Sequence, residues 1–199
     1  MLSELVAFLG ELFPSISPYT KQGAMDAMKQ FENYNIKSRF LTTSLDDDLQ
    51  QGDIFTLVPF VFIDENGDVN TLITKGMLLT NSCDATRNDE LQFAAMYRLE
   101  DYQRSGGDTR SIVNNKNYQF LYYPDNEIDG WYVDFGTITS ISRVVFLRLM
   151  EEHKSERLAS LNDIGWFVLI TKLTVFFMRP DDPEVLESRT SSTPKCESA

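Results

Sequence analysis

The clearest pattern of hydrophobic and polar positions lies in residues 51–84. β-Branched and aromatic side chains dominate residues 54–63, and an acidic turn containing Asn66-Gly67 follows them. Such runs are typical of β-strands, and Asn-Gly tolerates the positive φ angles of a tight hairpin turn. Pro59 has no backbone N–H to donate, so it predicts a sheet edge or a bulge at that point. We therefore expect a β-hairpin whose return strand covers residues 69–74.

Further short apolar runs, separated by polar turns, predict the remaining strands. Gly76 is expected to redirect the chain before a third strand, and Gly136 is expected to separate two late strands. The polar stretch 99–117 is expected to leave the sheet as a loop with one short helix. The expected strands after the hairpin cover residues 77–81, 91–97, 118–123, 131–135 and 137–141. Short successive strands without regular helical crossovers indicate a small antiparallel barrel or a strongly bent sheet.

Helical periodicity flanks these strands on both sides. Apolar residues recur at helical spacing in residues 2–13 and 21–31, and a third helix is expected to start near Ser142. The sequence Ser160-Leu161-Asn162-Asp163 resembles a capping box and predicts the start of a last helix. That helix, from Ile164 to Phe177, is apolar around much of its circumference. Two interpretations stay open for it: burial between the sheet or barrel and the N-terminal helices, or a homodimer interface.

These patterns together predict an α+β protein with three segments. Residues 1–49 form an N-terminal helical segment, and residues 50–179 form the sheet or barrel with its C-terminal helices. Residues 180–199 are rich in Pro, Ser, Thr and charge, which predicts a disordered tail. Helices before and after the sheet are expected to cap its open faces.

Composition narrows the classes of partner. The chain has 199 residues and a formal net charge of -12, so its surface repels phosphate backbones on average. Nucleic-acid binding is therefore disfavoured, and a protein partner, a basic one in particular, is favoured. No apolar run approaches the roughly 18 residues of a membrane span. Two cysteines, Cys83 and Cys196, indicate free thiols in a reducing compartment, which predicts a cytoplasmic protein without a membrane segment.

Candidate catalytic and metal-binding groups are few. Cys83 could act as a nucleophile only with a base beside it, and the single histidine, His153, lies in a polar helix end. Asp53, Asp84 and Asp89 could converge on a magnesium ion near one rim of the sheet. Turn capping is the favoured interpretation for these carboxylates. The sequence accordingly predicts no metal and no cofactor.

Several short segments resemble a known family. Gly-Asp-Ile in Gln51-Gly52-Asp53-Ile54 is similar to the start of its first strand, and the other matching segments are Gly76 to Ser82, Leu91 to Met96 and Trp131 to Arg143. The resemblance is to the SH3-like barrel of the MazF/PemK toxin superfamily, the endoribonucleases of bacterial toxin–antitoxin modules. It covers about residues 50–145. It implies an SH3-like barrel and a role in a bacterial or phage toxin–antitoxin or defence-type system.

The departures from this family affect the expected activity. The family places an Arg-Pro pair before its central strand, whereas this chain has Thr74-Lys75-Gly76. Lys75 supplies a positive charge but lacks the planar fork of arginine. RNA cleavage through the 2′-hydroxyl needs a base and an acid as well as a phosphate clamp. Lys75, Arg87 and Arg98 are candidates for the clamp, and no base is evident.

The sequence therefore favours a non-catalytic interaction protein that acts through a protein partner. Two alternatives stay open: a divergent endoribonuclease that uses Lys75 and Arg87, and an acidic inhibitor that mimics nucleic acid. The predicted binding surface is the polar loop that contains Asn81, Cys83, Asp84 and Arg87.

Overall fold

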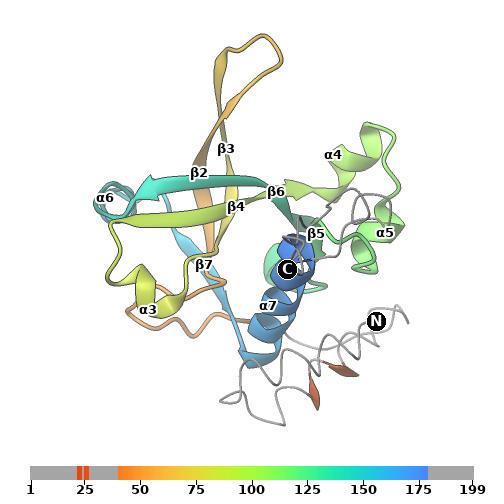
Figure 1. Ribbon diagram of the computed structural model, residues 1–199. Helices are drawn as coiled ribbons and strands as arrows, with labels where there is room; N and C mark the ends of the chain where they lie inside the picture. Colours follow the sequence, from red (N-terminus) through yellow and green to blue (C-terminus); the bar gives the residue numbers. More distant parts are fainter. Residues whose placement is uncertain (1–21, 24, 27–39, 179–199) are drawn as a thin grey trace, which may run out of the picture.

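The computed structural model describes residues 22–23, 25–26 and 40–178. Within this part, the chain forms an antiparallel seven-stranded sheet in the order β1-β7-β2-β3-β4-β6-β5 (Figure 1). The strands are β1 Leu41–Thr42, β2 Ile54–Ile63, β3 Val69–Leu78, β4 Glu90–Arg98, β5 Phe120–Tyr122, β6 Trp131–Ser142 and β7 Arg157–Leu161. The end strands β1 and β5 do not pair, so the sheet is bent but open. The predicted α+β class with a bent sheet is confirmed.

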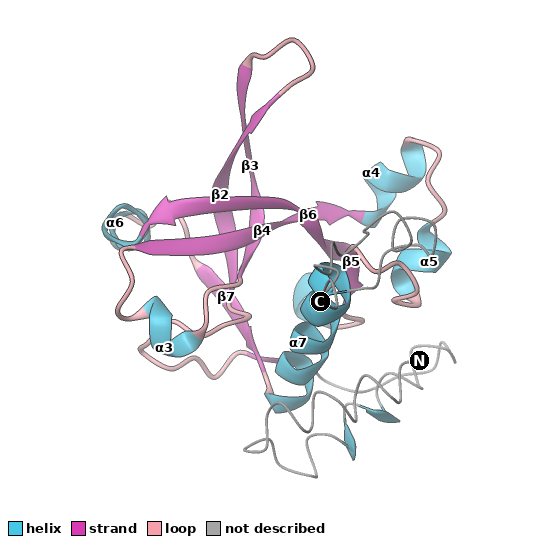
Figure 2. Ribbon diagram, in the orientation of Figure 1, coloured by secondary structure: helices cyan, strands magenta, loops and turns pink. Residues whose placement is uncertain are grey.

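Helices pack around this sheet (Figure 2). They are α3 Ser82–Ala85, α4 Leu99–Arg104, α5 Thr109–Val113, α6 Arg143–Glu151 and α7 Asp163–Met178, with a 3₁₀ turn at Asn126–Ile128. Helix α6 follows Ser142 as predicted. The helix predicted for residues 2–13 and the tail at 180–199 lie outside the described residues. Of the helix predicted for 21–31, only residues 22–23 and 25–26 are described, and they are helical.

The predicted hairpin is confirmed as β2–β3. Gly67 in the turn has φ 87°, which favours glycine. The register of β2 shifts between Phe55 and Val58, so a bulge lies there. Strand β7 pairs with β2 only at Ile54 and Phe55, and beyond the bulge Pro59 therefore occupies a strand edge. This is the position at which a proline removes no ladder hydrogen bond.

The predicted redirection of the chain at Gly76, before a separate third strand, is wrong. β3 runs without interruption from Val69 to Leu78, and Gly76 lies within it. A Cβ at this position would lie 2.7 Å from a methyl group of Val58, so the glycine permits close packing rather than a turn. The predicted break at Gly136 is also wrong, because β6 is continuous from Trp131 to Ser142. Its register against β4 shifts between Ala94 and Ala95, and Gly136 lies within that bulge.

Other elements differ from the prediction as well. Ser160, predicted to open a capping box, belongs to β7, a strand that the sequence pattern did not reveal. The cap of α7 is Asn162, whose Oδ1 accepts a hydrogen bond from the backbone N–H of Gly165 at 2.9 Å. The polar excursion at 99–117 holds two short helices rather than one, and α3 forms in a stretch predicted to be strand end and loop.

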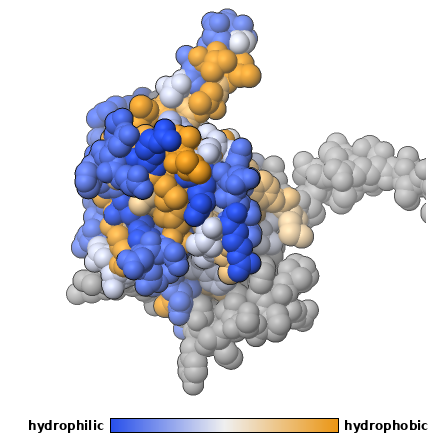
Figure 3. All heavy atoms as spheres, turned by 90° about the vertical axis from the view of Figure 1, so that its left-hand side faces the viewer, coloured by the Kyte–Doolittle hydropathy of each residue, from blue (hydrophilic) through white to orange (hydrophobic). Residues whose placement is uncertain are grey.

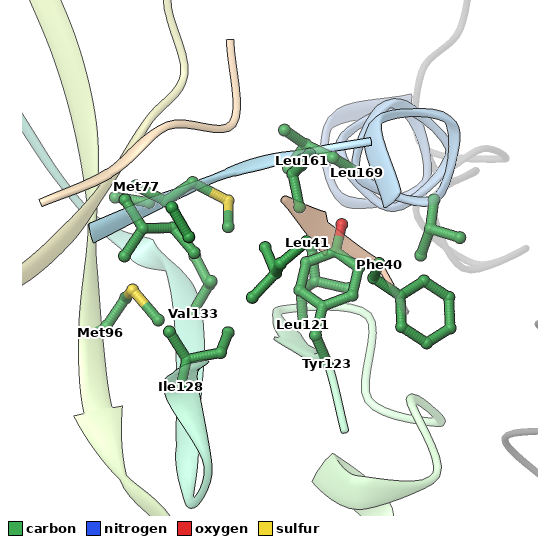
Figure 4. Close-up of a cluster of buried hydrophobic side chains, with 14 of the residues drawn as sticks. Phe40, Leu41, Met77, Met96, Leu121, Tyr123, Ile128, Val133, Leu161 and Leu169 are labelled. Atoms are coloured by element: carbon green, nitrogen blue, oxygen red, sulfur yellow. The ribbon is translucent and has the colours of Figure 1, made fainter. Parts of the chain in front are cut away.

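Two hydrophobic cores lie against the sheet. The first contains Phe167, Val168 and Leu169 of α7, packed against the residues drawn in Figure 4. Tyr123 belongs to this core, where its hydroxyl donates to the carbonyl of Gly165 at 2.7 Å and burial raises its pKa well above the ordinary value. The interior part of α7 is thus buried. The second core lies on the other side of β2–β4 and is closed by Phe146 of α6.

Candidate interaction surface

The outer half of the β2–β3 hairpin stands away from the body of the protein (Figure 1). Strand β4 pairs with β3 only at Gly76, Met77 and Leu78. Strand β7 leaves β2 after Phe55. Residues 58–74 therefore form a two-stranded projection, which we call the arm. Isolated two-stranded hairpins are marginally stable, so the arm depends on side-chain packing at its base.

One side of the arm is apolar and exposed. Residues that face each other in an antiparallel pair share a side, and Pro59, Val61 and Ile63 face Ile73, Thr71 and Val69. The exposed fractions are 57% for Val61, 70% for Ile63, 71% for Val69 and 62% for Ile73. We call these six residues the arm face. Val58 and Phe60, on the opposite side, are buried in the second core and hold the arm in place.

The tip of the arm is acidic. It contains Asp64, Glu65 and Asp68, and Figure 3 shows the hydrophilic tip above the apolar side chains of the arm. Backbone N–H donation from Asp68 at 3.0 Å and from Asn66 at 2.9 Å lowers the pKa of Asp64 below its ordinary value. These bonds fix the turn and keep its carboxylate charged. Glu65 and Asp68 are exposed.

The root of the arm is cationic. Lys75 Nζ lies 5.2 Å from the ring centroid of Trp131, and the guanidinium carbon of Arg98 lies 4.8 Å from the same centroid. Burial, and then the charge of Arg98, lowers the pKa of Lys75 below its ordinary value. Within the described part of the chain, Lys75 forms no ion pair, and Arg98 reaches only the exposed Glu100 at 3.9 Å. We call Lys75 and Arg98 the cationic root.

The arm face and the cationic root lie on one side of the sheet. Successive side chains of a strand alternate, so Val69, Ile73 and Lys75 of β3 point to the same side. Arg98 and Trp131 pair across β4 and β6 beside them. Along the arm the order from tip to root is thus acidic, apolar and cationic, over about 20 Å of strand.

The loop that the sequence predicted as a binding surface is exposed and surrounds α3. Asn81 Oδ1 caps this helix by accepting from the N–H of Cys83 at 3.0 Å. Cys83 is a free thiol at the surface, and Asp84 and Arg87 are also exposed. The structure brings these four residues together. Nothing in their contacts points to a particular ligand.

Of the three candidate clamp residues, Lys75 and Arg87 are not brought together. Lys75 lies near the Arg98 end of β4, while Arg87 lies just before Glu90 at the other end. A strand of this length spans about 26 Å. The two cations therefore do not form one site, and the second cation beside Lys75 is Arg98.

The three carboxylates considered for magnesium do not form a cluster. Asp53 is fully buried and pairs with Arg157 at 2.9 Å, while Asp84 and Asp89 are exposed. Among the residues that the structure describes, no three histidine, cysteine or acidic side chains gather as a metal site would require. Asp53 therefore has a structural role, in a buried ion pair.

An open hollow of about 590 Å³ lies where β7 leads into α7. Its lining consists of Thr42, Ser44, Asp46, Gln50, Ser160, Leu161, Asn162, Asp163 and Ile164. The hydroxyl of Ser160 is buried there without a hydrogen-bond partner among the described residues. None of these nine described residues is a cysteine, histidine or lysine.

Searches of protein-family models, of curated proteins and of solved structures return no match for this chain. The resemblance of residues 50–145 to MazF/PemK toxins therefore stays a prediction. No helix in the described ranges is both long and apolar enough to cross a membrane.

Lys172 is a buried amine on α7 that the sequence pattern did not single out. It is 5% exposed, and its Nζ donates to the carbonyls of Asn115 at 2.9 Å and Asn117 at 2.5 Å. Burial lowers its pKa to about 8. A neutral amine still has two hydrogens to donate, so deprotonation preserves both bonds. Lys172 thus ties the loop before β5 to α7.

We expect stability to rise with pH above about 8 because of Lys172. Its pKa is about 8 in the folded state, against 10.5 when unfolded, so in this interval the unfolded chain binds the extra proton. The free energy of unfolding should increase by about 2 kcal/mol between pH 8 and about 9.5. Above about pH 10 the raised pKa of Tyr132 acts in the opposite direction, because unfolding then releases a proton. Urea midpoints across this range measure the effect, and Lys172→Met should remove most of the rise, leaving the smaller part due to the lowered pKa of Lys75. An identical rise in the variant would contradict the assignment.

Proposed function

We propose that this chain is a non-catalytic protein-binding module that uses the arm face. The observation that supports the proposal is a contiguous apolar side on a projecting hairpin, flanked by an acidic tip and a cationic root. Exposed apolar patches rimmed by polar residues mark interaction sites in many proteins. The arm presents four large aliphatic side chains that are each more than half exposed.

The charges specify the chemistry of the partner. A protein that fits carries basic residues opposite Glu65 and Asp68, apolar side chains opposite the arm face, and an acidic group opposite Lys75 and Arg98. Complementary charges of this kind fix orientation and register more than they add affinity. The partner surface should therefore be an extended apolar segment with a base at one end and an acid at the other.

Binding explains the position of the charged residues better than catalysis does. Lys75 and Arg87 lie near opposite ends of β4, so they do not converge on one phosphate, and Lys75 and Arg98 lie together without an identified base. A role in a toxin–antitoxin or defence-type system rests on the resemblance of residues 50–145 alone, and we keep it as a prediction.

A displayed library of random peptides tests this function and requires no identified partner. We expect the peptides enriched on the purified chain to share a basic end, alternating apolar residues and an acidic end. Ile63→Asp should weaken their binding at least about tenfold, because it places a charge within the apolar contact. Fluorescence anisotropy of one enriched peptide measures the affinity.

Val144→Asp is the matched control. Val144 is 63% exposed on α6, close to the 70% of Ile63, and α6 packs in the second core, on the side of the sheet opposite the arm face. This variant should bind the peptide as the parent does. The proposal would be overturned if the Ile63→Asp variant bound the peptide as tightly as the parent chain. It would also be overturned if the enriched peptides lacked the charge pattern.

A further inference from the structure

We infer that the arm face is covered by a second copy of this chain, with the two arms packed face to face and antiparallel. This inference rests on the proposed function and names the partner. A second copy supplies all three features that the partner needs: an acidic end, an apolar middle and a cationic end, in the correct order.

The geometry of a two-fold axis explains why the pattern is self-complementary. In a symmetric dimer, if residue i of the first copy contacts residue j of the second, then residue j of the first copy also contacts residue i of the second. If the axis passes through the middle of the arm face, near Val61 and Thr71, the tip of each arm lies over the root of the other. Ile63 and Val69 near one end then contact Pro59 and Ile73 near the other, since each pair lies on the same side of the hairpin.

The charges select this orientation. Lys75 and Arg98 lie over the same indole, so each raises the cost of the other's charge; burial and, after it, the charge of Arg98 lower the pKa of Lys75. Glu65 and Asp68 of a second copy would offset that repulsion. A parallel arrangement would instead place tip against tip and root against root, and like charges would oppose it.

The same features favour a closed dimer over an open chain of copies. The arm face is used once by each copy in the two-fold arrangement, so the contact cannot propagate. Growth along the β2 edge is hindered by Pro59, which cannot donate to an added strand. The interface comprises the six residues of the arm face and the four charged residues at its ends from each copy, which is small for a stable complex, so we expect weak, reversible dimerisation.

Charge reversal provides a test that is specific for two copies of this chain. The tip variant carries Glu65→Lys and Asp68→Lys, and the root variant carries Lys75→Glu and Arg98→Glu. Alone, each variant places like charges against each other at both ends of the interface, and its dimerisation should weaken at least about tenfold. Mixed in equal amounts, the basic tip meets the acidic root and the acidic tip meets the basic root. The mixture should therefore form a heterodimer, detected by sedimentation velocity with one variant fluorescently labelled.

Three controls make the result interpretable. Reversal of the exposed pair Glu152 and Lys154, which are 2.6 Å apart after α6, should leave dimerisation unchanged. Urea midpoints establish that each variant folds. If the root variant does not fold, a variant with Lys75→Met and Arg98→Met replaces it and should still weaken the dimer.

A wild-type chain that stays monomeric at its highest soluble concentration would overturn the inference. So would a dimer that is insensitive to both reversals. If peptides bind the arm in the library experiment while the chain stays monomeric, the proposed function holds and only the identity of the partner is wrong.

Discussion

Replacing Arg157 with methionine should lower the free energy of unfolding by about 3–5 kcal/mol. Arg157 pairs with the fully buried carboxylate of Asp53 at 2.9 Å, and its guanidinium also donates to the carbonyls of Asp46 and Asp48. The same carboxylate accepts from the backbone N–H of Gln50 at 2.8 Å. Loss of the guanidinium would leave a buried, uncompensated charge and free the loop before β2. Chemical denaturation at neutral pH measures the change.

Arg104→Met is the matched control for this prediction. Arg104 pairs with Asp101 at 2.9 Å and with Glu100 at 3.2 Å, but all three side chains are more than half exposed. Exposed pairs contribute at most about 1 kcal/mol. Adding Asp53→Asn to the Arg157 variant should recover part of the loss, because it removes the unpaired charge. If the Arg157 and Arg104 variants lost equal free energy of unfolding, the buried pair would contribute no more to stability than an exposed one.

The Asp53–Arg157 pair also illustrates what the sequence could not reveal. From the sequence, Asp53 fits the start of a strand, a turn cap or a metal ligand. Each of these roles is inferred from the residues next to it in the chain. Its actual partner lies 104 residues later, on a strand that sequence reasoning missed. β7 has five residues, and Ser160 within it imitates a helix cap. Long-range pairing decided the role of both residues, and no local pattern encodes it.

The hairpin itself was predictable because its signals are local. Asn66-Gly67 specifies the turn, and the β-branched run specifies the strand. The exposed arm face was not predictable, because residues 54–63 are apolar on both sides of the strand. Which side is exposed depends on where β4 and β7 stop pairing with the hairpin. In addition, the bulge after Phe55 breaks the regular alternation of side chains between the two faces of the strand, so the faces cannot be assigned by counting residues from Ile54.

The cationic root was likewise hidden in the sequence. Lys75 and Arg98 stand out only as candidate phosphate clamps through a family resemblance, and nothing in the sequence indicates that they share Trp131. They meet because β4 lies between β3 and β6 in this register. The polar loop at Asn81 to Arg87 stands out because its residues are contiguous. The residues of the cationic root and Trp131 come from three strands and are far apart in the sequence, so no local sequence pattern reveals that they meet.

The arm can serve as a binding surface only if its other side is firmly anchored. An unsupported hairpin would lose conformational entropy on binding, and its apolar residues would promote non-specific association. Phe60 is 1% exposed in the second core, where Val58 and the half-buried Leu72 accompany it. The stability of the fold and the presentation of the arm face therefore depend on the same side chains.

Phe60→Ala should lower the free energy of unfolding by about 3–5 kcal/mol. It removes a ring from a core whose other rings, Phe55, Phe93 and Phe146, already contact one another at ring-centroid distances of 4.5 to 5.9 Å. A close-packed aromatic cluster of this kind fills a deleted ring only in part, so a cavity remains. Denaturation curves measure the loss, and amide hydrogen exchange in residues 58–74 should accelerate more than in β4.

Phe62→Ala supplies a control on the same strand and the same side. Phe62 lies two residues from Phe60 but is 45% exposed, so its loss should cost at most about 1 kcal/mol. Neither phenylalanine belongs to the arm face, and the Phe62 variant should therefore bind arm-directed peptides as the wild type does. The Phe60 variant should bind them more weakly at temperatures where its arm exchanges freely. If the two variants lost equal stability, the second core would not be what holds the arm, and its apolar side could not be a preorganised surface.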